Sequence, residues 1–370
     1  MLTTDFIVIG AGIAGASAAA ELAAHGSVML LEMEAQPGYH ATGRSAAFFA
    51  AAYGSKLIRD ITGSCERFFM EPPDGFTTTD LIRLRDCMFF GRADQMEQLL
   101  AMQENNARLR FLDAAAVRER VPVLSEDYLH GAMWDRMGGD LDVDAILQAY
   151  LRLMRRRGGT ALNNHSVKAL RKTAGVWQVS AGGEEFCAPV VVNAAGAWAE
   201  KVAILAGLDP IGIKPLLRSA FLIDPPAGID IENWPLMLDA YEDFYFKPDA
   251  GQIMICPADE TAVEPCDAQA DDFAVAMGVD RFEKATGLDI RQVNHRWAGL
   301  RTFAPDRVFV AGFDPRRKGF CWLAGQGGYG VQSAPAMAHM TSWLITGEEP
   351  PAGFAKVMEF KKAVAPDRLL

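Results

Sequence analysis

The sequence lacks any apolar run long enough to cross a membrane. Its longest uncharged apolar stretches, Ser45–Tyr53 and Val190–Ala199, fall well short of the roughly 20 residues that a transmembrane helix needs. Positive charge is also in deficit, because 47 acidic residues outnumber 36 lysines and arginines and leave a net charge of −11. Such a chain is not attracted electrostatically to nucleic acid or to anionic lipid. We therefore expect no membrane span and no nucleic-acid partner.

Paired cysteines and clustered histidines are missing too. The six cysteines are scattered without a C-x-x-C pair, and the six histidines show no metal-ligand spacing. This usage is typical of reduced thiols in a reducing compartment. No signal peptide precedes the first predicted strand, which begins at Phe6. We expect a soluble, cytoplasmic protein without a metal site, and its 370 residues are enough for two domains.

What the sequence does contain is a complete β-α-β pattern at its N-terminus. Apolar residues at Phe6–Ile9 and Val28–Leu31 predict two buried strands, and Ala16–Ala24 predicts the helix between them. Three glycines in G-x-G-x-x-G spacing lie between the first strand and the helix, and an acidic residue closes the second strand. The candidate cofactor-binding residues of this fingerprint are Gly10, Gly12, Ile13, Ala14, Gly15 and Glu32.

Each part of such a fingerprint has a physical role in binding a dinucleotide. Gly10 permits the tight turn, and Gly12 lets the backbone approach a pyrophosphate at the helix N-terminus. Gly15 lets the helix pack closely on the strand, and Glu32 can accept hydrogen bonds from a ribose. Because strand, glycines, helix, strand and acid all occur in order, the pattern predicts a dinucleotide site rather than an ordinary glycine-rich turn.

A polar, glycine-punctuated loop follows the second strand directly. Its sequence, QPGYHATGRSAA over residues 36–47, offers hydrogen-bond donors that could cover the pyrophosphate and isoalloxazine of a flavin. A plain surface loop is the alternative. The candidate cofactor-binding residues in this loop are Thr42, Gly43, Arg44, Ser45 and Ala47.

The fingerprint together with GYHATGRSAA resembles the D-amino-acid oxidase superfamily of FAD enzymes, and within it most closely the bacterial D-arginine dehydrogenases. The resemblance extends over nearly the whole chain. It implies an FAD enzyme whose chemistry needs no nucleophile from the protein. The fold that it implies is α/β, with a Rossmann-type, glutathione-reductase-like FAD-binding domain. An α+β substrate domain built on an antiparallel sheet is inserted into it. We assign residues 1–88, 142–210 and 296–370 to the FAD-binding domain, and residues 89–141 and 211–295 to the substrate domain.

Two later segments complete the expected FAD site. The apolar strand in VVVNAAGAWA, residues 190–199, would lie beside the first strand, and the resemblance implies that Val167 presents its backbone to the adenine. Near the C-terminus a strand, a glycine-rich turn and a helix recur, and the helix N-terminus would face the flavin. The further candidate cofactor-binding residues are Val167, Ala195, Gly196, Trp198, Arg301, Gly327, Gly328, Tyr329, Gly330, Val331 and Gln332.

Amine oxidation by a flavin requires a fixed substrate carboxylate rather than a nucleophile. Arg218 and Arg301 occur in apolar contexts, LLRSAFLI and WAGLRTF, where arginine is costly to bury without a partner. They could form a bidentate carboxylate clamp, or else structural salt bridges. The resemblance implies the clamp. It adds Tyr245 and Tyr53 as carboxylate contacts and the Gly328 carbonyl as acceptor for the amine.

The departures from the D-arginine dehydrogenase pattern concern the substrate side chain. Where those enzymes bind the guanidinium with a Glu and a His, this chain has Cys87 and Phe48, and a threonine of their mobile lid is replaced by Ala50. A buried cation without a counter-ion would be strongly disfavoured, and Leu236 and Leu238 would add apolar wall. We therefore expect a D-amino acid with a neutral or hydrophobic side chain.

The related sarcosine oxidases attach their flavin through a cysteine, bind carboxylate with one lysine and activate oxygen with another. This chain has Gly299 and Gln332 at the first two positions and no lysine at the third, near Met254. We expect non-covalent FAD and a dehydrogenase that passes electrons to a quinone or another acceptor. The alternatives are oxidation of an N-methylated or cyclic amino acid or of a 2-hydroxy acid, and a flavin-binding protein without turnover.

Overall fold

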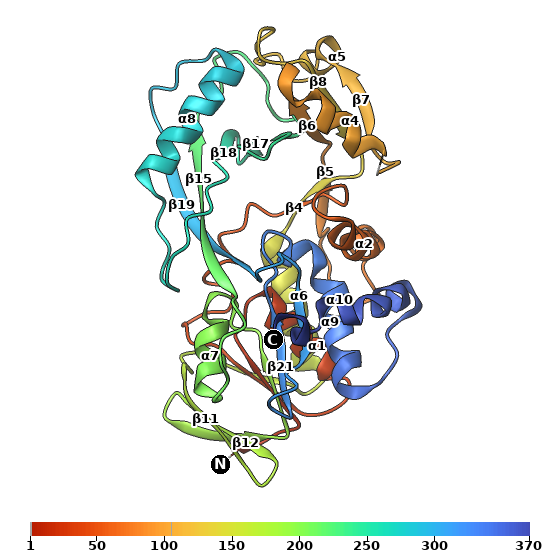
Figure 1. Cartoon of the computed structure of the whole chain (residues 1–370), viewed down its shortest axis with the longest axis vertical. Helices are drawn as coiled ribbons and strands as arrows, with labels where there is room; N and C mark the ends of the chain where they lie inside the picture. The colour runs from red at the N-terminus through yellow and green to blue at the C-terminus, as the bar shows by residue number, and fades with distance from the viewer. Residues whose placement is uncertain (1, 105) are drawn as a thin grey trace.

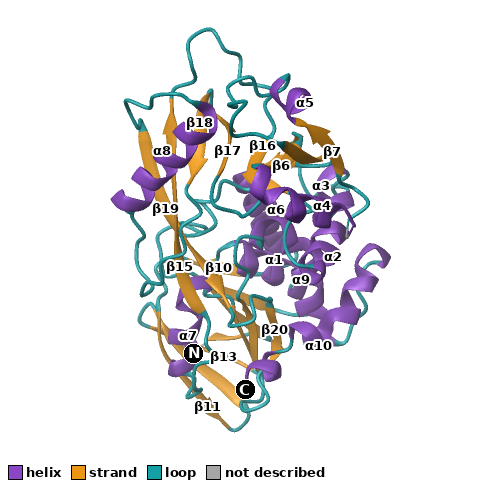
Figure 2. Ribbon diagram, turned by 45° about the horizontal axis from the view of Figure 1, so that its top comes forward, coloured by secondary structure: helices purple, strands orange, loops and turns teal. Residues whose placement is uncertain are grey.

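Two large sheets, one in each half of the elongated molecule, organise the chain (Figure 1). The computed structural model describes residues 2–104 and 106–370. The half that holds both termini contains a six-stranded sheet, and the other half contains most of an eight-stranded sheet (Figures 1 and 2). This division positions the site, because the candidate cofactor residues of one half face the candidate substrate residues of the other.

The six-stranded sheet is of the Rossmann type. All neighbouring strands are parallel except the last pair, which is antiparallel. Its strands read as continuous apolar runs because both faces are covered, and Ile7 and Val8 are both fully buried although they point to opposite faces. In spatial order the strands are β10 (Thr160–Leu162), β3 (Val28–Leu31), β2 (Phe6–Ile9), β14 (Val190–Asn193), β21 (Phe320–Ala324) and β20 (Val310–Phe313).

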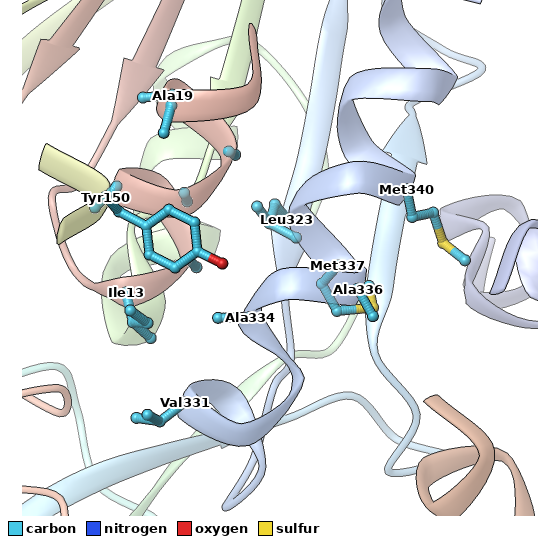
Figure 3. Close-up of a cluster of buried hydrophobic side chains, with 14 of the residues drawn as sticks. Ile13, Ala19, Tyr150, Leu323, Val331, Ala334, Ala336, Met337 and Met340 are labelled. Atoms are coloured by element: carbon cyan, nitrogen blue, oxygen red, sulfur yellow. The ribbon is translucent and has the colours of Figure 1, made fainter. Parts of the chain in front are cut away.

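Two apolar helices, α1 (Ile13–Leu22) and α9 (Gly330–Thr346), pack against each other on one face of this sheet. Figure 3 shows side chains of α1 and α9 meeting Tyr150 of α6 (Val143–Arg156) and Leu323 of β21. Helices that are apolar on all sides belong in a core. The first helix begins at Ile13, earlier than the predicted Ala16, because the glycine turn ends at Gly12, which is its N-cap.

The eight-stranded sheet carries the candidate substrate residues. Its pairs are antiparallel except for the parallel pair of β16 and β6. In spatial order it contains β19 (His295–Phe303), β15 (Lys214–Ile223), β18 (Gln252–Cys256), β17 (Tyr245–Asp249), β16 (Leu236–Asp239), β6 (Cys87–Gly91), β8 (Gly131–Asp135) and β7 (Arg110–Asp113).

The long β15–β19 ladder runs from the Lys214–Phe303 pair to the Leu222–His295 pair and joins the two halves (Figure 2). The two sheets confirm the predicted fold class of a Rossmann-type unit combined with a second unit built on a largely antiparallel sheet. The assigned domain limits stay a prediction.

The remaining elements cover these sheets and close the edges. A four-stranded sheet contains β1 (Leu2–Thr3), β13 (Glu184–Ala188), β12 (Val176–Ala181) and β11 (Val167–Thr173), and a three-stranded one contains β4 (Phe48–Phe49), β9 (Gly139–Leu141) and β5 (Ile82–Leu84). The other α-helices are α2 (Lys56–Ser64), α3 (Glu66–Met70), α4 (Met96–Glu104), α5 (Ala114–Arg118), α7 (Ala199–Leu205), α8 (Asp272–Thr286) and α10 (Lys361–Val364). Within residues 2–104 and 106–370, no helix combines the length and apolarity that a membrane span requires.

Candidate active site

A cavity of about 470 Å³ runs between the glycine fingerprint and the eight-stranded sheet. Its size is in the range of small-molecule and cofactor sites, which enclose roughly 300–1,000 Å³. Segments from distant parts of the sequence line it, and Arg218 of β15 and Tyr245 of β17 join the five main ones. The five main segments are the fingerprint with Glu32, the loop 38–46, residues 165–168, residues 194–198, and a C-terminal set that includes 299–302 and 326–328.

The fingerprint glycines are required by close backbone approach. A Cβ on Gly15 would lie 1.8 Å from the Gly10 carbonyl oxygen, and one on Gly10 would lie 2.6 Å from the Ala194 carbonyl oxygen. Gly10 also has a φ of 98°, which side chains rarely allow. At Gly12 a Cβ would meet the Thr42 hydroxyl at 3.1 Å. The turn is therefore packed so tightly that any side chain at Gly10 or Gly15 would displace main chain.

Two polar side chains anchor the walls of this end of the cavity. The buried Glu32 carboxylate accepts from Ala11 N at 2.7 Å and from Glu34 N at 3.0 Å. Thr42 Oγ1 accepts from Ile13 N at 3.0 Å, so the loop is tied to the first turn of α1. Both side chains line the cavity, and their predicted contacts with the ribose and the pyrophosphate stay predictions.

Arg44 connects the same loop to a strap, which we define as residues 257–271, between β18 and α8. Its guanidinium donates to Ala268 O at 2.8 Å and to Ala298 O at 3.3 Å, and it contacts the Asp267 carboxylate. At the far side of the cavity, Trp198 packs against His40 with a ring separation of 4.5 Å. Val167, Ala195 and Gly196 also line the wall.

The sequence profile of a family described as FAD-dependent oxidoreductases, abbreviated DAO, matches residues 5–344. The chain belongs to the DAO family. Its cofactor is FAD, and the glycine cradle, the helix N-terminus and the buried Glu32 fit that group.

Relatives of this family share little sequence but much of the fold. The chain is 24% identical to the uncharacterized oxidoreductase YurR of Bacillus subtilis, over 93% of this chain and 95% of the relative. It is 23% identical to rat mitochondrial dimethylglycine dehydrogenase, over 94% of this chain but only 43% of that enzyme. An Escherichia coli L-2-hydroxyglutarate dehydrogenase is 27% identical over 56% of this chain and 50% of its own length.

Two solved structures define the fold relationship. Glycine oxidase from Geobacillus kaustophilus superimposes with a TM-score of 0.83 at 20% identity, covering 96% of this chain and 98% of its own. L-proline dehydrogenase from P. horikoshii gives a TM-score of 0.80 at 20% identity, covering 98% and 99%. These likenesses establish the DAO-family fold, whereas the finer resemblance to D-arginine dehydrogenases stays a prediction.

At the substrate end of this DAO-family cavity lies Arg301. It projects from β19, and its Nη2 donates to the Tyr245 hydroxyl at 3.3 Å. No Asp or Glu in the described ranges forms an ion pair with it, although burial without a partner is costly for a cation. Burial raises the pKa of Tyr245 above its ordinary value, so its hydroxyl stays protonated. Arg301 and Tyr245 therefore present hydrogen-bond donors at the cavity, and no carboxylate of the described residues accepts from Arg301.

Arg218 lines the same cavity from the neighbouring strand β15, but it has a counter-ion. Its Nη2 donates to Glu260 Oε1 at 2.9 Å, and its side chain is only 11% exposed. Of the two interpretations of Arg218 that the sequence left open, the salt bridge is observed, and the carboxylate clamp stays a prediction. Sequence reasoning missed Glu260, because the surrounding PADETAVEP carries no motif that marks a partner for a residue 42 positions away.

Gly328 lies against the Arg301 guanidinium. A Cβ there would be 2.8 Å from Arg301 Nη1 and 2.9 Å from Cζ. We predict that Gly328→Ala displaces the guanidinium and raises KM for the substrate about 10-fold, because a 1 Å misplacement of a positioning group can cost up to about 100-fold in rate. Steady-state kinetics will test this. An unchanged KM in a correctly folded, FAD-loaded variant would contradict it.

The candidate lid residues lie behind the cavity wall. The Tyr53 hydroxyl donates to Glu242 Oε2 at 2.8 Å, and its ring lies 5.2 Å from that of Tyr329. Gln332 accepts from Ala50 N at 2.9 Å, so its side-chain oxygen holds the lid segment. Sequence reasoning did not find Glu242, which lies in an exposed turn after β16.

Phe48 and Cys87 belong to one apolar cluster with Leu236 and Leu238, the two residues that were predicted to add an apolar wall. Cys87 is 1% exposed, and its strand neighbour Leu236 pairs with it directly across β16 and β6. Tyr53, Tyr245 and Leu238 pack in the same cluster. The predicted site residues that do not line the main cavity are Gly15, Gly43, Ala47, Phe48, Tyr53, Cys87, Tyr329 and Gln332.

Proposed function

We propose that the protein oxidises a D-amino acid with a neutral or hydrophobic side chain, giving the imino acid. The carrying observation is the partly buried Arg301, which lies with Tyr245 at the end of the FAD cavity and has no carboxylate partner among the described residues. Charge-assisted bidentate hydrogen bonds to a substrate carboxylate would satisfy this cation. The resemblance to D-arginine dehydrogenases supports the D configuration and the clamp.

In this proposal the FAD supplies the hydride acceptor for the substrate Cα–H. Arg301 and Arg218 bind the carboxylate, Tyr245 donates to it, and the Gly328 carbonyl accepts from the amine. The predicted contact from Tyr53 would require its hydroxyl to leave Glu242, to which it donates in this structure. Holding the substrate in this way converts the reaction into an oriented, unimolecular step, which is the main contribution a protein can make here. Phe48, Cys87 and the leucines beside them would enclose the side chain.

The apolar cluster predicts the order of substrates. We expect kcat/KM for D-Leu, D-Met and D-Phe to exceed that for D-Arg and D-Lys by about 100-fold or more, because a buried, uncompensated charge costs several kcal/mol. The double variant Phe48→His with Cys87→Glu should narrow this ratio by restoring an anion. A panel of D-amino acids, assayed with an artificial acceptor, measures it. Higher activity with D-Arg or D-Lys in the natural chain would contradict the apolar pocket.

A second candidate substrate class is supported by the clamp itself. Arg301 and Tyr245 recognise a carboxylate and leave open whether an amine, a secondary amine or a hydroxyl stands on Cα. The named relatives include dimethylglycine and L-2-hydroxyglutarate dehydrogenases. Anaerobic titration with N-methylated and cyclic amino acids and with 2-hydroxy acids separates these classes. Flavin that no candidate reduces would indicate a flavin-binding protein without turnover.

We also propose that FAD is bound non-covalently, that a quinone or a similar acceptor receives the electrons, and that the protein acts in the cytoplasm. Gly299 provides no side chain for a flavin linkage, and a Cβ there would approach only Arg44 and Ala41. Release of free FAD on denaturation tests the first point. Rapid peroxide formation with substrate would contradict a dehydrogenase.

A further inference from the structure

The guanidiniums near the substrate end of the cavity outnumber the carboxylates that face them. Glu260 is the carboxylate that pairs with Arg218, and it also accepts two hydrogen bonds from Arg307, at 3.0 Å and 2.7 Å. Arg301 stands nearby without an ion pair of its own. Among the described residues, Glu260 is the one carboxylate that forms ion pairs with this group of three arginines, and Glu242 nearby bonds to the Tyr53 hydroxyl. Three guanidiniums against these two carboxylates leave an excess of positive charge, which suits an anionic ligand.

The backbone fixes Glu260 opposite Arg218. Leu217 N donates to Thr261 O at 2.8 Å, and Ser219 N donates to the Asp259 carboxylate at 2.7 Å. The residues on either side of Arg218 are therefore bonded to those on either side of Glu260. The strap consequently lies along β15 in a register that places the carboxylate against the guanidinium before any ligand binds.

Only part of the Arg218 guanidinium is used in this contact. Glu260 holds Nη2, whereas Nε is buried and has no hydrogen-bond partner. A buried donor without an acceptor is costly, by about 1–3 kcal/mol. Nε itself is shielded from the cavity, but Arg218 lines that cavity with 11% of its side chain exposed, so the part of the guanidinium that Glu260 does not hold is left for another acceptor.

We propose that Glu260 is a positioning residue. By holding Nη2, it orients the Arg218 side chain so that the rest of the guanidinium meets the substrate carboxylate. The inference rests on the proposed function, since it assumes that Arg218 belongs to the carboxylate clamp. Arg307 in turn holds Glu260, with both carboxylate oxygens engaged. Burial by itself would raise the pKa of Glu260, but the hydrogen bonds and charges of Arg307 and Arg218 outweigh this effect. The pKa of Glu260 is therefore below its ordinary value, and its carboxylate is ionised at neutral pH.

Two substitutions separate the effect of the Arg218–Glu260 hydrogen bond from the effect of the negative charge on Glu260. Glu260→Gln removes the charge but keeps an oxygen that can accept from Arg218, whereas Glu260→Ala removes both. If Glu260 acted only as a competing negative charge, both variants would bind a carboxylate more tightly. If it positions Arg218, Glu260→Ala binds about 10-fold more weakly and Glu260→Gln stays within about 3-fold of the natural chain.

The measurement is titration of the FAD-loaded protein with isocaproate, the deaminated analogue of leucine, followed by the flavin absorbance spectrum. Glu264→Ala is the matched control, because this strap acid is 88% exposed and pairs with Lys201 outside the clamp. In a double-mutant cycle, Glu260→Ala should have no further effect in the Arg218→Ala background. Should Glu260→Ala fail to fold, Glu260→Ser replaces it.

Equal or tighter isocaproate binding by Glu260→Ala would overturn the proposal, as would equal weakening by Glu260→Gln or additive effects in the cycle. The result is independent of turnover. If no D-amino acid reduces the flavin while the isocaproate series behaves as expected, the proposed function fails and the role of Glu260 stands. If substrates reduce the flavin but the series does not follow this order, only the role of Glu260 fails.

Discussion

Arg301→Ala is expected to lower kcat/KM for the preferred amino acid by about 1,000-fold, or about 4 kcal/mol, within the range for truncating one partner of a buried charge pair. Arg301 would contribute most of the carboxylate recognition, because it is partly buried and has no ion pair in the described chain. Arg301→Lys keeps the charge but loses the planar fork, so an intermediate loss of about 30-fold is expected. Steady-state kinetics on both variants provides the comparison.

The same substitution should not destabilise the protein without its substrate. Removing a partly buried cation that has no anionic partner among the described residues also removes the part of its desolvation cost that burial imposes, so the Tm of Arg301→Ala should be unchanged or higher. Thermal unfolding of the ligand-free variant tests this. A clearly lower Tm together with a small kinetic effect would show that Arg301 is structural and would remove the basis of the proposed function.

Gly15→Ala is expected to weaken FAD binding by about 100-fold, or about 3 kcal/mol, at the upper end of the cost of overpacking. The new Cβ would start 1.8 Å from the Gly10 carbonyl oxygen, so the fingerprint turn must open. This turn carries the backbone that approaches the pyrophosphate. Equilibrium dialysis against FAD, followed by flavin fluorescence, measures the change in Kd.

Gly63→Ala is the matched control for this prediction. Gly63 lies inside α2, and a Cβ there would meet nothing within 4 Å. Alanine in a helix interior should stabilise the protein by up to about 1 kcal/mol and leave FAD affinity unchanged. Circular dichroism of both proteins without FAD distinguishes a local effect from misfolding. Natural FAD affinity in Gly15→Ala would show that the turn tolerates a side chain.

The cofactor half of the molecule could be predicted largely from the sequence, because its signals are local. The order of strand, glycines, helix and acid from Phe6 to Glu32 defines the unit, and the closest contact in its turn, between Gly15 and the Gly10 carbonyl oxygen, is local. Strands β2 and β3 were predicted at their observed limits, Phe6–Ile9 and Val28–Leu31, because each is a short apolar run bounded by polar residues or glycine. The limits of the helix between them, Ile13–Leu22, differ by two or three residues from the predicted ones, since caps and turns decide them.

The substrate half was less accessible, because its residues come together across long sequence separations. The sequence identified Arg218 and Arg301 as buried cations, but it did not reveal that Glu260 pairs with the first while the second has no ion pair in the described chain. That difference depends on the strap lying along β15, which hydrogen bonds between distant segments set.

The sequence alone therefore determined that this chain binds a dinucleotide, because the glycines that the tight turn requires form a local pattern with the strand before them and the helix after them. Only the tertiary structure decided which cation remains available for a ligand. The charge balance around Arg218 and Arg301 is a sum over groups from the strap, β17 and the C-terminal turn. No local pattern encodes that sum, since each contribution depends on distance and burial in the folded chain.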